Sequence, residues 1–405
     1  MTTAQGINKI TSIKKQTALG AAASGAGGSV LTRNTAVFSA PRDSYESAVI
    51  TTHQQSTGIA YGMKKPAGKL DSLLSNQTYE LLFAAILRKD FVATSAYAAG
   101  IDVTAQAASP QFVDASGGFL TAGLKVGDVV RWTGFAGSPG TDNNSKNFWI
   151  TALTATNMTG VFLNGTAVAA DAAGDSVTCT VVGKKTRAPT TAHTNDYFTV
   201  EEFYTDLVKS ETYTDARVTN IAVGLPASGN ATFSADFLAL GRTLGVAQVL
   251  TSPTEPTFRE MAAVNGKIYV NGAALGDCTG VQFTIDGSGA VDGPVIGSNS
   301  GIDVSRGRIK VSGSFSALFD ATTIQALYDA ETTVSLMTVV TEDETATSAC
   351  LAFTLGAIKL TDDAPDDGEK AITRTYPFTA EYNSAGGAAL AWDQTILTVQ
   401  DTQLS

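Results

Sequence analysis

The sequence is poor in the residues on which catalysis and metal binding usually depend. It contains 3 cysteines and 2 histidines in 405 residues. Cys179, Cys278 and Cys350 lie far apart and form no CxxC pair, so we expect buried free thiols and neither a disulfide framework nor a zinc site. His53 and His193 lie in the threonine-rich stretches TTHQQ and TAHTN, and we expect surface or interface positions for both instead of catalytic ones.

Motifs of hydrolytic and nucleotide-binding enzymes are absent as well. The chain has no GxSxG, HExxH, Walker-type P-loop or strand-to-helix GxGxxG. The glycine-dense stretch Gly287–Gly301 lacks a lysine and a following helix, so we interpret it as a loop. The acidic run Asp362–Asp367 carries Pro365 in its middle and lacks the alternating ligands of a calcium loop, which indicates a solvated turn. We therefore predict a non-enzymatic protein with no catalytic, cofactor-binding or metal-binding residues.

Charged residues and long apolar runs are also scarce. Only 16% of the residues are charged, and no apolar run is long enough for a membrane span. Met1–Ala23 has lysines but no continuous apolar core, so we predict no signal peptide and expect synthesis in a cytoplasm. The net charge of −11 argues against a general nucleic-acid binder, which neutralises phosphates with clustered Lys and Arg. A channel through which DNA slides without sticking would have such an acidic or neutral lining.

What the chain does contain is typical of many short strands. Ala, Gly, Ser and Thr are abundant beside 43% hydrophobic residues, and the length predicts two or three domains. Trp132 and Trp149 are expected in the core of a small inserted domain. We predict these boundaries: a flexible N-terminal arm at 1–33, a first strand-rich domain at 34–92 and 187–245, an inserted small β-domain at 93–186, a linker at 246–262, a second strand-rich domain at 263–385 and a C-terminal tail at 386–405.

Two segments have the pattern of a strand, a polar cap and a helix. In the first, Ser75 and Asn76 offer cap oxygens to a helix that ends with Arg88 and Lys89. In the second, Gly313–Ala330, Asp320 is the expected cap. Similar strand patterns follow each helix, at Tyr197–Asp206 and Val334–Asp343, then at Arg217–Leu225 and Ala349–Leu360. We favour an internal duplication over a chance likeness of strand patterns. The predicted fold is mainly β, with two tandem β-sandwich or barrel units, each flanked by one α-helix, plus the inserted β-domain.

This arrangement resembles the major tail tube protein family of siphophages, the bacteriophages with long, non-contractile tails. The residues that carry the resemblance are the N-terminal arm, Arg33–Ser72, Gly123–Phe135 and Arg217–Gly241. The resemblance implies a virion protein that forms homo-oligomeric rings stacked into a tube, whose lumen conducts double-stranded DNA during ejection without specific binding. It also implies contacts with the tape measure protein and with tail terminator and tip proteins, and none with a membrane.

Most members of that family have one tube domain and form hexamers, so a duplicated chain would reach six domains as a trimeric, pseudo-hexameric ring. The inserted domain would project outward. The arm and a loop within Ala40–Gln55 would bind the next ring, although a merely disordered arm is an equal alternative. Three other functions remain open: a capsid decoration protein, a head–tail connector and a surface adhesin module. The absence of a signal peptide weighs against the adhesin, and the duplication weighs against the decoration protein and the connector.

Overall fold

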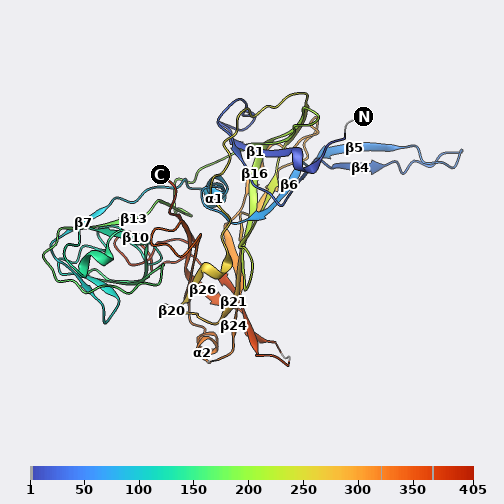
Figure 1. Ribbon diagram of the computed structural model, residues 1–405. Coiled ribbons are helices and arrows are strands. Elements are labelled where there is room, and N and C mark those ends of the chain that lie inside the picture. The colour runs from blue at the N-terminus through green and yellow to red at the C-terminus, as the bar shows by residue number, and fades with distance from the viewer. Residues whose placement is uncertain (1–2, 321, 367–368) are drawn as a thin grey trace.

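The computed structural model describes residues 3–320, 322–366 and 369–405, and most of its ordered elements are antiparallel strands (Figure 1). This confirms the predicted mainly-β class. The described part has two α-helices, α1 (Glu80–Leu87) and α2 (Thr323–Asp329). It also has three short 3-10 helices, η1 (Gly6–Asn8), η2 (Gly140–Asn143) and η3 (Ala263–Asn265).

One continuous antiparallel sheet, here called the central sheet, runs through both halves of the chain. Its strands are hydrogen-bonded in the order β3, β6, β17, β16, β21, β24, β28. Their bounds are β3 (Thr35–Ser39), β6 (Ala67–Leu73), β17 (Thr232–Leu238), β16 (Lys209–Pro226), β21 (Cys278–Asp286), β24 (Lys310–Leu318) and β28 (Thr373–Ala380). The pairing of β16 with β21 joins the first half of the chain to the second.

Further strands form a second layer over one face of each half, with the hydrophobic core between the layers. In the first half these are β1 (Lys9–Lys15), β2 (Ser29–Val30), β15 (Phe198–Tyr204) and β18 (Gly241–Gly245). In the second half they are β19 (Gly266–Val270), β20 (Ala273–Ala274), β25 (Val334–Thr341) and β26 (Cys350–Leu360). Strands β14 (Lys184–Arg187) and β29 (Thr398–Asp401) extend this layer beside β26, and the short β27 (Ala364–Pro365) pairs with β28.

Both halves follow one order of strand pairing. The first half pairs β1 with β2 and β15, β6 with β3 and β17, and β16 with β15 and β17. The second half pairs β19 with β20 and β25, β24 with β21 and β28, and β26 with β25 and β28. A hairpin interrupts each half at the same place, formed by β4 (Arg42–Glu46) with β5 (Ile59–Lys64), and by β22 (Gly289–Val291) with β23 (Val304–Arg306).

A separate seven-stranded sheet lies between α1 and β14 in the sequence and forms its own lobe (Figure 1). Its strands are β7 (Tyr97–Gly100), β8 (Val103–Gln106), β9 (Gln111–Asp114), β10 (Val129–Thr133), β11 (Phe148–Leu153), β12 (Asn157–Phe162) and β13 (Val177–Val181). Trp132 and Trp149 are fully buried in this lobe, as expected. The same core continues onto Met337, Val339 and Cys350, so the lobe packs against the second half.

The segment expected as a flexible N-terminal arm differs from that expectation. β1 pairs along its whole length with β15, and Ile13 has no exposed surface. Lys9 forms an ion pair with Glu202 at 2.6 Å. The average composition of residues 1–33 conceals this strand, because the Ala/Gly/Ser run that follows it outweighs one short stretch of alternating side chains.

Both helices are shorter than expected. α1 begins at Glu80, and the residues predicted to cap it lie in the preceding loop, where Asn76 donates to the Asp401 carboxylate at 2.7 Å and Ser75 bonds to Thr78. The helix ends before Arg88, whose left-handed φ of 61° terminates it. α2 is preceded by Thr322, so Asp320 is not its cap.

Candidate assembly surface

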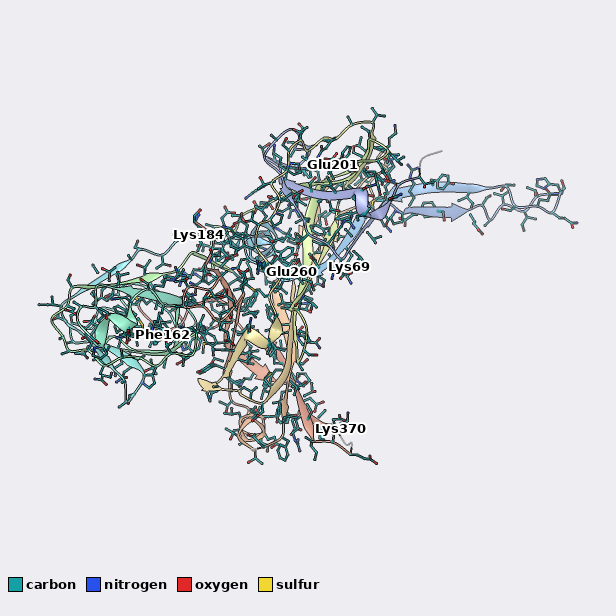
Figure 2. The ribbon with its side chains drawn as sticks, in the orientation of Figure 1. Lys69, Phe162, Lys184, Glu201, Glu260 and Lys370 are labelled. Carbon is teal, nitrogen blue, oxygen red and sulfur yellow. The ribbon has the colours of Figure 1, made fainter. Side chains whose placement is uncertain are left out.

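The central sheet has one face in the core and one exposed, as expected for an antiparallel sheet with alternating side chains. The exposed face is lined mainly by small polar side chains and forms a shallow groove of about 830 Å³. Two neighbouring rows of cross-strand partners illustrate it: Thr35, Asp71, Ser234, Ala222, Thr284, Ser312, Thr379, and then Val37, Lys69, Asp236, Asn220, Asp286, Lys310. Lys69 is labelled in Figure 2 and forms an ion pair with Asp71 at 3.0 Å.

On the buried face, an equivalent arrangement of aromatic residues recurs in both halves. Gly68 of β6 stands between Phe38 of β3 and Phe237 of β17. In the second half, Gly313 of β24 stands between Phe283 and Phe378 in the same way. A Cβ at either glycine would collide with its neighbours, at 2.0 Å from the Phe38 ring or 2.2 Å from the Gln282 carbonyl. Each glycine therefore helps to fix the register of its own three strands, β3–β6–β17 in the first half and β21–β24–β28 in the second.

The central sheet ends in two edges that lack a neighbour among the described residues. At one end, β3 pairs with β6 alone. At the other, residues 361–366 pair with β28 alone, through Thr361 N to Pro377 O and Asp366 N to Thr373 O, both at 2.8 Å. Unpaired edges are templates for association with another strand. The second edge includes Pro365 and exposed aspartates, which limit nonspecific pairing and leave a charged edge for a complementary strand.

The β4–β5 hairpin projects from the body beside the first edge (Figure 1). Its loop carries Val49 and Ile50, and Ile50 is fully exposed at 98%. Tyr45, Ile59 and Tyr61 of its strands are also more than half exposed. An exposed apolar group of this size on a thin hairpin indicates a contact with another molecule. The segment Ala40–Gln55, in which the sequence placed a loop, contains strand β4 and the first part of the hairpin loop.

A buried polar network joins the lobe to the second half. Lys185 contacts Asp128 at 2.9 Å and Asp393 at 3.7 Å. The Lys125 ammonium donates to three backbone carbonyls, those of Gly387, Ala388 and Leu390, at 2.6–2.8 Å. Burial and the nearby Lys185 charge lower the pKa of Lys125 to about 8. Lys125 therefore links the lobe to the C-terminal segment through hydrogen bonds to backbone carbonyls.

The histidines and cysteines that the sequence analysis considered for catalysis or metal binding do not lie together in one site. His53 and His193 are both exposed. Cys179 and Cys350 are buried free thiols whose pKa values burial raises, and Cys278 is half-buried. Among the residues that the structure describes, no group of His, Cys, Asp and Glu side chains is placed to hold a metal ion. In the same ranges, neither helix is long and apolar enough to cross a membrane.

The glycine-dense and acidic stretches are largely surface features. Gly287–Gly301 contributes β22 and then a loop, so the loop interpretation holds for most of it. Asp362 and Asp366 are exposed, and Asp363 pairs with Arg374 at 2.8 Å. The last residue of the acidic run, Asp367, lies outside the described residues. Lys370 follows on the same projection (Figure 2).

Comparison with known proteins adds one match. A family model described as phage tail tube protein matches residues 6–380, which is nearly the whole chain. No curated protein matches the sequence.

Proposed function

The chain belongs to the phage tail tube protein family, so its role is structural and its place is the virion tail; from this premise we propose that three copies form a ring and that stacked rings form the tube wall. Each copy would supply two tube units produced by duplication. The lumen would conduct double-stranded DNA during ejection without binding it specifically.

The observation that carries this proposal is the pairing of β16 with β21. It joins the two halves edge to edge, and each half has the same order of strand pairing. Residues 361–366 form one edge of the central sheet. They pair with β28 in the way that the C-terminal part of β16 pairs with β17. At the opposite edge of the central sheet, β3 pairs with β6 in the way that β21 pairs with β24. Residues 361–366 of one copy would therefore pair with β3 of the next.

Such a contact is head-to-tail, and it closes into a ring when the rotation between copies divides a full turn. A closed ring leaves no free edge in the central sheet, which removes the hazard of unpaired backbone groups. If each tube unit rotates the sheet by the same angle about the ring axis, six units close a pseudo-sixfold ring. Three copies supply these six units.

The exposed face of the central sheet is the proposed wall of the lumen. Its rows consist largely of hydroxyl, amide and small side chains, with three aspartates and two lysines between them. Phosphates find few cations there, so the counterion release that drives DNA binding is small. DNA would pass along such a wall without strong attachment. The lobe containing Trp132 and Trp149 would lie on the outer surface.

Stacking would use the β4–β5 hairpin, because its loop presents Val49 and Ile50 to solvent in a single copy. Burying this apolar tip in an adjacent ring would add affinity at three points per ring. The tape measure protein would occupy the lumen, and terminator and tip proteins would cover the tube ends.

Negative-stain electron microscopy of the concentrated protein, together with its mass in solution, tests this function. Hollow tubes whose ring unit has the mass of three chains are the expected result. Discrete knobs that bind capsids would support a decoration protein instead, and rings of six chains would contradict the two-unit arrangement.

A further inference from the structure

The hairpin beside the first edge contains an unfavourable pair of charges. Arg42 of β4 lies directly opposite Lys64 of β5. Like charges at such positions repel each other. Within the described residues neither side chain has a carboxylate within 4 Å, whereas the neighbouring Lys65 pairs with Asp43 at 2.8 Å. This pair of cations would be stabilised by an acidic partner from another molecule.

The junction within the chain indicates where such a partner would lie. Arg88 follows α1 with a left-handed φ of 61°, and its guanidinium donates to the carbonyls of Gly287 and Gly307. These two glycines flank the β22–β23 hairpin at its base. Glu331 follows α2 with a similar φ of 51°. In the ring, Glu331 would therefore face the base of the next copy's β4–β5 hairpin, where Arg42 and Lys64 lie.

The register of the sheet brings a second acid to the same place. On β17, Phe233 lies four residues before Phe237 and pairs with Val223. On β28, Arg374 lies four residues before Phe378 and pairs with Pro365. Pro365 thus holds the place of Val223, which pairs with Phe283 within the chain. Because Phe38 holds the place of Phe283, Pro365 would pair with Phe38 of the next copy. Counting back along the antiparallel ladder, Asp362 would then meet Pro41, next to Arg42.

Nearby charges leave this edge acidic. Asp363 is already paired with Arg374. Lys359 donates to the Glu331 backbone carbonyl, so it does not neutralise that carboxylate directly. Asp366 and Glu369 are exposed beyond the contact, and so is the cation Lys370.

We infer that ring closure depends on complementary charge, with Glu331 and Asp362 of one copy binding Arg42 and Lys64 of the next. This inference rests on the proposed ring. Within the chain, the β16–β21 ladder pairs mostly apolar and small residues, and one ion pair, Arg217–Asp303 at 3.5 Å, also links the two halves. The contact between copies should weaken as salt screens its charges.

Charge reversal tests the contact. The variant Arg42→Glu/Lys64→Glu and the variant Glu331→Lys/Asp362→Lys each place like charges across it, and the fourfold variant restores complementarity with the signs exchanged. Each pair should raise the concentration needed for ring closure at least tenfold, and the fourfold variant should recover most of this loss. Raising the salt concentration should weaken wild-type closure. Lys146→Glu/Lys209→Glu is a control with the same charge change at residues outside the contact.

Circular dichroism and the unfolding midpoint of each variant report whether it folds, and mass in solution reports closure. If the wild type closes rings and both twofold variants close them equally well, the proposed charge contact is refuted, whereas the proposed ring is not affected. Failure of the fourfold variant to recover, although it is folded, would also overturn the contact. A wild-type chain that closes no ring at any concentration would overturn the proposed ring itself.

Discussion

The ring of Phe38 occupies the space above Gly68, the residue opposite it on β6, so that a Cβ on Gly68 would lie 2.0 Å from Phe38 Cδ1. Gly313 likewise lies opposite Phe283, but there a Cβ would meet the Gln282 carbonyl oxygen at 2.2 Å instead of the phenylalanine ring. A side-chain ring can move aside more easily than backbone. The two positions are equivalent in the sheet but not in their tolerance of substitution.

We predict that Gly313→Ala destabilises the protein by about 1–3 kcal/mol, as overpacking does, and that Gly68→Ala has a smaller effect. Urea unfolding measures both. Gly276→Ala is the matched control, because a Cβ there meets nothing within 4 Å. Equal stability of Gly313→Ala and wild type would show that the sheet register is not held by this row.

The N-terminal strand should contribute to folding, because Ile13 is fully buried against the first half of the sheet. Ile13→Ala is expected to cost about 2–5 kcal/mol of unfolding free energy. Deleting residues 1–28 removes the whole of β1 and should reduce stability further. A deletion mutant with wild-type stability and impaired stacking would instead restore the view of this segment as an arm.

The hairpin tip should affect stacking alone. Ile50 is 98% exposed, so Val49→Ser/Ile50→Ser should leave the unfolding midpoint unchanged while shortening or abolishing tubes. Tube length in electron micrographs, beside ring mass in solution, is the measurement. Val264→Ser, which also alters an exposed apolar residue, is the control. Tubes of normal length would exclude the tip from the contact between rings.

Mixing the two charge-reversed variants should reveal whether a ring has an odd number of copies. Each variant repels itself but binds the other, so they alternate. Alternation cannot close a ring of three, because two like copies must then be neighbours. Native mass spectrometry of an equimolar mixture should find open pairs and chains. Closed rings with equal amounts of both variants would show an even number of copies.

Lys125 should make stability depend on pH. Its pKa is about 8 in the folded protein against 10.5 for the ordinary side chain, so between these values the unfolded chain binds more protons. Stability should therefore rise with pH above 8, with a slope of at most about 1.4 kcal/mol per pH unit. Below pH 8 this contribution is constant and unfavourable.

Urea unfolding between pH 7 and pH 9.5 measures this slope, and Lys125→Met should flatten it. The same substitution should lower stability overall, because three carbonyls lose their donor. A wild-type slope that the substitution leaves unchanged would assign the pH dependence to other groups.

The sequence by itself determined the class of the protein. Alternating apolar and polar residues with small-residue turns specify strands, and the same local pattern placed Trp132 and Trp149 in a buried sheet. The scarcity of histidine and of motifs likewise follows from the sequence alone. Each of these conclusions depends on residues close together in the chain, where the period of the pattern is sufficient.

Only the tertiary structure decided which strands are neighbours. The period of a strand says which side chains share a face, but not which partner supplies the hydrogen bonds on either edge. Ile13 is buried because β15, far along the chain, pairs with β1. Asn76 leaves its expected capping position because it bonds to Asp401, 325 residues away. The junction of β16 with β21 and the two open edges arise in the same way, from burial and hydrogen bonding between distant segments.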